Sequence, residues 1–150
     1  MKIVINATYG GFSLSPLAIQ KLYKAKGKRC YFFKYDFENK KYTPLTLKET
    51  EEELIVFNYS VPNPQDYKLE ERDGNGLYCS ANKRAEEISI DVWDINRADK
   101  DLIRIIEELG EKANGKHAKL KIIEIPDNID WGIAEYDGSE WVAEKHKTWS

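Results

Sequence analysis

Two stretches of the chain combine residue types that can bind anionic ligands. The first is residues 8–15, TYGGFSLS, in which Gly10 and Gly11 allow positive φ and a close approach of the backbone. Free amides at a helix start, together with the hydroxyls of Ser13 and Ser15, can hold a phosphate. The alternative is an ordinary turn, because the stretch matches neither the P-loop nor the dinucleotide-binding fingerprint.

The second stretch is residues 91–101, which follow a predicted strand and precede a predicted helix. It places four aspartates around one arginine, namely Asp91, Asp94, Asp99 and Asp101 around Arg97. The Arg97 guanidinium could grip a phosphate or carboxylate bidentately while Asp94 or Asp99 accepts a ribose hydroxyl. The alternative is structural, because Asp99 can cap the helix and acidic residues near a helix start stabilise it through the dipole.

A third candidate lies in the hairpin predicted around Asp137 and Gly138. Counting outward from this dipeptide places Glu135 opposite Glu140, and facing carboxylates can act as general acid and base. The alternative is a small electrostatic penalty on a solvent-facing hairpin. His146 could stack on a base or act as a general base, or it could belong to a surface tail.

No motif indicates a metal site or an activated nucleophile. His117 and His146 are the only histidines, and neither has a second histidine or a cysteine at ligand spacing. A G-x-S-x-G motif is also absent. We therefore expect no metal, no cofactor and no catalytic residues, and a small hydrolase using Glu135, Glu140 or His146 ranks last among the functions considered.

Hydrophobic periodicity predicts a single α+β domain with a mixed sheet, two main helices and a C-terminal β-hairpin. The expected strands and hairpins cover residues 2–6, 30–47, 54–59, 88–93, 119–125, 131–136 and 139–143. The first strand contains three consecutive apolar residues, so we expect it to be buried on both faces in the middle of a sheet. Residues 63–83 carry little pattern and are expected to form a loop or an insertion.

Capping residues indicate both helices. Ser15 and Pro16 are expected to begin the first helix, and Gly27 to end it. Asp99 is expected to cap the second helix, whose apolar residues recur at helical spacing until Asn114.

The two strand-to-helix turns would open on the same side of a sheet if strands 2–6 and 88–93 ran parallel. A ligand would then sit in the cleft between them. The predicted ligand-binding residues are Thr8, Tyr9, Gly10, Gly11, Phe12, Ser13, Asp94, Arg97, Asp99 and His146.

The composition is that of an ordinary folded protein. Its 150 residues are 41% hydrophobic and 33% charged, which excludes a disordered chain. The formal net charge of -3 argues against a protein that wraps nucleic acid, because such binding depends on clustered Lys and Arg. The short basic clusters are read as solvated helix surface.

Neither a secretory leader nor a membrane span is expected. The apolar run at the start is too short for a signal peptide, and no run approaches the length needed to cross a bilayer. Cys30 and Cys79 lie far apart without ligand spacing, so we interpret them as reduced thiols. These features predict a soluble, cytoplasmic protein.

The opening MKIVINATYGGFSLSPLA and the closing EIPD, EYDG and EKH-x-TW motifs resemble a family of small, largely uncharacterised bacteriophage proteins. In this chain Ala98 stands where the family usually has Thr or Ser, which moves the capping role to Asp99 or Asn96. Residues 48–90 match the family only loosely. The resemblance implies a phage accessory protein that acts in the host bacterial cytoplasm, where such proteins often counter host defence.

Three functions are compatible with these observations. The first is a non-enzymatic binder that sequesters a nucleotide-derived signalling molecule of host immunity. The second is a protein–protein inhibitor of a bacterial defence enzyme, acting through aromatic strands and an acidic surface. The third is the small hydrolase. A homo-oligomer is compatible with all three, whereas a membrane or nucleic-acid partner is not expected.

Overall fold

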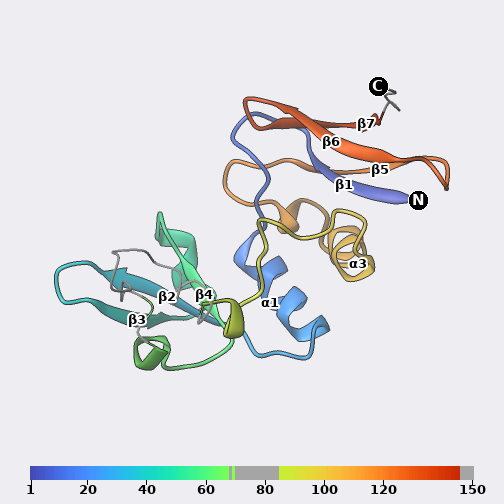
Figure 1. Ribbon diagram of the computed structural model, residues 1–150. Coiled ribbons are helices and arrows are strands. Elements are labelled where there is room, and N and C mark those ends of the chain that lie inside the picture. Colours follow the sequence, from blue (N-terminus) through green and yellow to red (C-terminus); the bar gives the residue numbers. More distant parts are fainter. Residues whose placement is uncertain (68, 70–84, 146–150) are drawn as a thin grey trace, which may run out of the picture. The chain divides into compact units, whose positions relative to one another are not determined.

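The computed structural model describes residues 1–67, 69 and 85–145 (Figure 1). It combines two main helices with antiparallel strand pairs and a C-terminal β-hairpin, which confirms the predicted α+β class. The chain forms two compact units. Unit 1 comprises Met1–Leu22 and Val92–Ser150, and unit 2 comprises Tyr23–Asp91. In sequence, unit 2 is therefore inserted between the two segments of unit 1.

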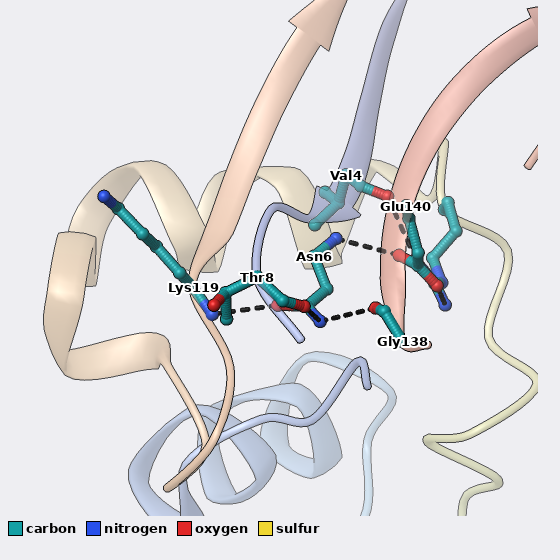
Figure 2. A network of polar contacts seen from close by, with 7 residues as sticks. Val4, Asn6, Thr8, Lys119, Gly138 and Glu140 are labelled. Atoms are coloured by element: carbon teal, nitrogen blue, oxygen red, sulfur yellow. Dashed lines mark hydrogen bonds and ion pairs between the residues drawn. The ribbon is translucent and has the colours of Figure 1, made fainter. Parts of the chain in front are cut away.

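The strand β1 (Lys2–Asn6) forms the centre of unit 1. It pairs antiparallel with β5 (Leu120–Glu124), and Val4 lies opposite Ile122 in the register. The side chains of β1 from Ile3 onward are buried, as the apolar run predicted. Among the described strands β1 pairs with β5 alone, so the expected position in the middle of a sheet is wrong. Figure 2 shows β1 lying between β5 and β7 (Ser139–Glu144).

The strands β6 (Trp131–Tyr136) and β7 (Ser139–Glu144) form the predicted C-terminal hairpin. Its turn residues Asp137 and Gly138 have φ values of 50° and 86°, as a two-residue type I′ turn requires. Glu135 pairs with Glu140, which is the register expected from counting outward from the turn.

The helix α1 (Pro16–Ala25) begins and ends as its capping residues predicted. The Ser15 hydroxyl accepts a hydrogen bond from the backbone N–H of Ala18 at 3.2 Å. At the other end, Gly27 has φ 78°, and the Lys28 N–H donates to the carbonyl of Tyr23 at 2.9 Å. This six-residue closure is a Schellman motif, which satisfies carbonyls that the helix end leaves free.

The helix α3 (Lys100–Leu109) continues into a 3₁₀ turn at Gly110–Ala113. The Asp99 carboxylate caps it by accepting from the backbone N–H groups of Asp101 and Leu102 at 2.9 and 3.0 Å. The apolar side of α3, formed by Leu102, Ile105 and Ile106, is buried.

The end of the 3₁₀ turn holds the start of α1. The Ser15 N–H donates to the Ala113 carbonyl at 2.8 Å, and the Ser15 hydroxyl donates to the Lys112 carbonyl at 2.6 Å. Leu14 forms an isolated bridge with Asn114. These contacts fix Leu14 and Ser15 directly before α1.

Unit 2 is built on a three-stranded antiparallel sheet. Its strands are β2 (Tyr31–Asp36), β3 (Lys41–Leu45) and β4 (Phe57–Tyr59), in the order β3-β2-β4. The predicted hairpin between residues 30 and 47 is confirmed. Asp36 organises its turn by accepting from the backbone and side chain of Asn39.

The core of unit 2 is aromatic. Phe33, Tyr42, Tyr59 and Ile88 are buried together, and the rings of Phe33 and Tyr42 meet edge to face at 5.9 Å. The hydroxyls of Tyr42 and Tyr59 share a hydrogen bond at 3.1 Å, which satisfies both polar tips inside the core.

The strand predicted at residues 88–93 does not form, so that prediction was wrong. Residues 85–87 are helical, and the Ile88 N–H donates to the Ala85 carbonyl at 3.2 Å instead of to a neighbouring strand. The alternating apolar residues do not form one buried face, since Ile88 packs in the aromatic core while Trp93 is exposed. The condition of parallel strands at 2–6 and 88–93, under which both turns would open on one side of a sheet, is therefore not met.

The other differences concern element lengths. β4 is shorter than predicted, because Leu54 and Ile55 precede it in an exposed turn. The expected loop at 63–83 opens with a 3₁₀ helix, Pro64–Tyr67, and most of its remainder lies outside the described residues. Among the helices that the structure describes, none is sufficiently long and apolar to span a membrane.

Candidate functional site

A buried asparagine links the segments that meet at one end of unit 1 (Figure 2). The Asn6 side-chain N–H₂ donates to the carbonyls of Thr8 and Gly138 at 2.7 and 2.8 Å, and its oxygen accepts from the Lys119 N–H at 2.9 Å. The Asn6 backbone N–H donates to Glu140 at 2.8 Å. The polar groups of Asn6 thus hold β5, the loop after β1 and the hairpin turn in one arrangement.

Arg97 and Glu140 form a bidentate ion pair beside this asparagine. Arg97 Nη1 and Nη2 donate to the two carboxylate oxygens of Glu140 at 2.6 and 3.0 Å. Their side chains are only 14% and 6% exposed. A planar guanidinium facing a carboxylate in this way makes one of the stronger polar contacts found in proteins.

Arg97 and Glu140 also hydrogen-bond to the edge of β1 that faces away from β5. Odd-numbered residues of β1 bond to β5, so the backbone groups of Val4 and Asn6 point away from it. The Val4 N–H donates to the Arg97 carbonyl at 2.9 Å, and the Val4 carbonyl accepts from Arg97 Nη1 at 3.3 Å. Arg97 and Glu140 therefore satisfy the backbone groups that a neighbouring strand would normally satisfy.

Phe12 brings the first predicted stretch against the second. The Arg97 guanidinium carbon lies 3.7 Å from the centre of the Phe12 ring, in a cation–π contact, and Phe12 is buried. The two turns thus meet in space, although not through parallel strands. Phe12 covers one face of the guanidinium, and Nη1 and Nη2 donate to Glu140 and Val4, so Arg97 is engaged by the protein itself.

Close backbone packing requires glycine at positions 10 and 138, whereas a Cβ on Gly11 would meet no atom within 4 Å. The Gly10 N–H donates to the Asp137 carbonyl at 3.3 Å, and a Cβ on Gly10 would lie 2.9 Å from the His117 carbonyl oxygen. A Cβ on Gly138 would collide with the Gly11 nitrogen. These glycines place the loop directly on the hairpin turn, so the alternative of a structural turn accounts for their positive φ.

The remaining predicted site residues have separate positions. The Ser13 carbonyl accepts from the Gly115 N–H at 3.0 Å, and Asp99 is occupied as the cap of α3. Asp94 is exposed in the loop before Arg97. His146 lies outside the described residues, so its predicted role stays a prediction.

The opposed glutamates of the hairpin have unequal surroundings. Glu135 is exposed, whereas Glu140 is buried and accepts from Arg97 and Asn6. The expectation of two solvent-facing carboxylates is therefore wrong for Glu140. Both of its carboxylate oxygens accept hydrogen bonds from residues of unit 1.

Exposed aromatic side chains lie around this end of unit 1. Tyr9 is 63% exposed, Tyr136 is 72% exposed and Trp141 is 50% exposed. Tyr9 directly precedes Gly10 in the chain and Tyr136 directly precedes Asp137, and the Gly10 N–H donates to the Asp137 carbonyl. Tyr136 and Trp141 project from the same face of the hairpin as diagonal neighbours, because Tyr136 pairs with Ser139.

Sequence reasoning missed the structural roles of Asn6 and Glu140, and it missed the contact of Gly138 with the loop after β1. A signal was present for Glu140, because a glutamate facing a second glutamate across a hairpin needs a counter-ion when one face is buried. Asn6, a polar residue directly after three consecutive apolar residues of its strand, gave a similar signal. Neither pattern identifies the residues that form the hydrogen bonds, because those residues lie far away in the sequence.

Among residues 1–67, 69 and 85–145, no group of three or more His, Cys, Asp or Glu side chains could hold a metal ion. Comparison with known proteins found no matching family model, curated protein or solved structure.

Proposed function

We propose that this protein is a non-enzymatic binding protein whose partner is another protein. The observation that carries the proposal is the group of exposed rings, Tyr9, Tyr136 and Trp141, named here the aromatic surface. Tyrosine and tryptophan dominate the energetics of protein interfaces, because each buries a large area and keeps a polar tip.

A firmly held backbone supports this role. The Asn6 hydrogen bonds and the contact between Gly138 and Gly11 fix the segments that carry Tyr9 and Tyr136. Anchor side chains on a pre-organised backbone lose less conformational entropy when they are buried in an interface. The resemblance to phage accessory proteins favours a host defence protein in the bacterial cytoplasm as the partner.

Binding of a nucleotide-derived molecule is the second candidate. The exposed Tyr9 ring, beside the glycine turn, favours it because aromatic rings stack on nucleobases. Arg97 supports it less than expected, since its guanidinium is already paired with Glu140. A phosphate would have to displace that carboxylate to reach it.

Affinity capture from bacterial lysate tests the first proposal. The bait is the intact protein, compared with a variant carrying Tyr9→Ser, Tyr136→Ser and Trp141→Ser. The matched control is Phe37→Ser, which removes an equally exposed ring from unit 2. We expect one host protein to be retained by the wild type and by the Phe37→Ser variant and lost by the triple variant; equal retention by all three would reject the aromatic surface.

A thermal-shift assay with linear and cyclic nucleotides tests the second candidate. A ligand that binds the native state raises the melting temperature, and the rise should be smaller in the Tyr9→Ser variant. An unchanged melting temperature across the panel would remove the nucleotide hypothesis.

A further inference from the structure

Among the strands that the structure describes, β6 pairs with β7 alone, so its other edge is left without a partner strand there. Tyr136 and Ser139 flank the turn and exchange hydrogen bonds, so Tyr136, Ala134 and Gly132 face β7. The hydrogen bond from the Lys145 N–H to the Asp130 carbonyl at 2.8 Å continues this alternation.

The backbone groups of Trp131, Ile133 and Glu135 consequently point away from β7. Within the part of the chain that the structure describes, no backbone or side-chain group hydrogen-bonds to them. Natural edge strands usually avoid pairing by means of proline, a bulge or inward charges, because free N–H and C=O groups can bind another strand. β6 contains no proline, and its ladder with β7 pairs every residue in register without a bulge.

We propose that β6 binds an extended, basic segment of the partner protein by strand addition. This rests on the proposed function and names its binding mode. The added strand would hydrogen-bond to the outward groups of Ile133 and its neighbours, and its side chains would alternate between the two faces of the hairpin.

One face of β6 suits apolar side chains of such a segment. Gly132 and Ala134 are small, and the exposed rings of Tyr136 and Trp141 lie on the same face. A Cβ on Gly132 would lie 3.2 Å from the Lys145 side chain, so the long aliphatic stem of that lysine borders the face. Apolar residues at alternate positions of an added strand would contact these groups.

The negative charge around β6 favours a segment with basic side chains. Three exposed carboxylates border β6, those of Asp130, Glu135 and Asp137. Among the described residues, an ion pair is formed by Asp130 alone of these three, with Lys145 at 3.9 Å. Lysine or arginine at the other alternate positions of the added strand would face Glu135, which lies on the opposite face from Tyr136.

The same charges disfavour a second copy of this chain as the occupant. Two β6 strands pairing antiparallel through their outward backbone groups would be centred on Ile133. They would bring Asp130, Glu135 and Asp137 of both copies to one short pair of strands, and such a gathering of like charges is destabilising. The occupant we infer is therefore a basic strand rather than β6 itself.

The test uses a fluorescent peptide of alternating valine and lysine, about eight residues long, which matches a typical strand. Fluorescence anisotropy measures its binding to the intact protein at roughly 150 mM salt, where weak surface charge effects are screened. We expect saturable binding. Methylating every second backbone amide of the peptide should weaken binding about tenfold or more, because it removes the ladder donors.

Ile133→Pro and Ile133→Ala provide matched variants of the protein. Proline is tolerated on an edge strand where the N–H faces outward, so Ile133→Pro removes the central donor of the edge while the fold is kept, which circular dichroism checks. Ile133→Ala shortens the side chain but retains the N–H. We expect Ile133→Pro to weaken binding about tenfold and Ile133→Ala by no more than about threefold.

Several results would overturn strand addition. These are absence of saturable binding up to millimolar protein, equal affinity for the methylated peptide, and self-association through β6 without peptide binding. The methylated peptide acts on the wild-type protein, so it decides the matter even if Ile133→Pro does not fold.

Lysate capture separates this inference from the proposed function. The Ile133→Pro variant keeps Tyr9, Tyr136 and Trp141. If it retains the host protein that the triple variant loses, the aromatic surface stands and strand addition fails. If the triple variant retains that protein, the proposed function fails whatever the peptide shows.

Discussion

Arg97 and Glu140 lie 43 positions apart in the chain and form a bidentate ion pair that occupies the free edge of β1. Besides bonding to each other, Arg97 donates to the Val4 carbonyl and Glu140 accepts from the Asn6 backbone N–H. Its removal should therefore disturb the centre of unit 1 rather than a surface contact.

Glu140→Ala is expected to lower the free energy of unfolding by about 3 kcal/mol, because it leaves a largely buried guanidinium without its counter-ion. Replacing both residues, in Arg97→Met with Glu140→Leu, should cost less than the sum of the two single changes. Urea denaturation measures the cost. The control is Glu135→Ala, which removes the exposed cross-strand partner and should change stability by less than about 0.5 kcal/mol. Equal effects of Glu135→Ala and Glu140→Ala would contradict the structural role of the pair.

Asn6→Ala should destabilise the protein by about 2 kcal/mol, because the Lys119 N–H and the Gly138 carbonyl would lose their partner in a partly buried position. Asn6→Asp should be no better tolerated, since a carboxylate cannot donate to the carbonyls of Thr8 and Gly138. Thermal denaturation gives the comparison. Thr8→Ala serves as the control, because only its backbone carbonyl takes part. A stable Asn6→Ala protein would show that the network is dispensable.

Gly138→Ala and Gly27→Ala separate two costs of adding a methyl group. Both positions have positive φ, but nothing lies within 4 Å of a Cβ on Gly27, whereas one on Gly138 would collide with the Gly11 nitrogen. We expect about 1 kcal/mol for Gly27→Ala from backbone strain alone. Gly138→Ala should cost about 3 kcal/mol, since overpacking adds to the strain. Chemical denaturation provides both values, and similar costs would argue against the close contact of the two turns.

Cys30 should react slowly with alkylating reagents. Burial raises the pKa of its thiol to about 12 because the charged thiolate is disfavoured away from water. At pH 8 the thiolate fraction is then roughly a thousandfold below that of an ordinary cysteine. Mass spectrometry of iodoacetamide-treated protein in a Cys79→Ser background should show slow labelling that accelerates in urea. Labelling at the same rate in both conditions would refute the burial of the thiol.

The same shift predicts the pH dependence of stability. A pKa raised in the folded state contributes stability that is present below the ordinary thiol pKa of 9.0 and is lost as the pH rises towards 12. The free energy of unfolding should therefore fall over that interval, and the fall should be smaller in Cys30→Ser. An identical pH profile for the Cys30→Ser protein would exclude this contribution.

Local signals predicted the helices and hairpins well. Ser15 and Asp99 cap their helices, and Asp137 with Gly138 forms the expected turn, because each feature depends on residues a few positions apart. The strand expected at 88–93 failed for the opposite reason. The apolar residues of this stretch alternate because they make unrelated contacts; Ile88, for example, packs in the aromatic core. The sequence pattern of such residues is the same as that of a β-strand.

The candidate site shows the same division. Glycines in a strand-to-helix turn correctly marked a close backbone approach, but the approaching group is the hairpin turn rather than a ligand. Arg97 was selected for its ability to bind a carboxylate, and it does so with Glu140 of the same chain. Long-range pairing of this kind depends on the assembled fold, which one sequence does not reveal.

The insertion of Tyr23–Asp91 into unit 1 has a consequence for biosynthesis. β1 is synthesised before the other strands of unit 1, and the Glu140 carboxylate that binds Asn6 is 134 positions further along the chain. All of unit 2 is synthesised between these two points. The apolar residues of β1 therefore stay unpaired in the nascent chain until β5, α3 and the hairpin have been made, since domains generally fold as units.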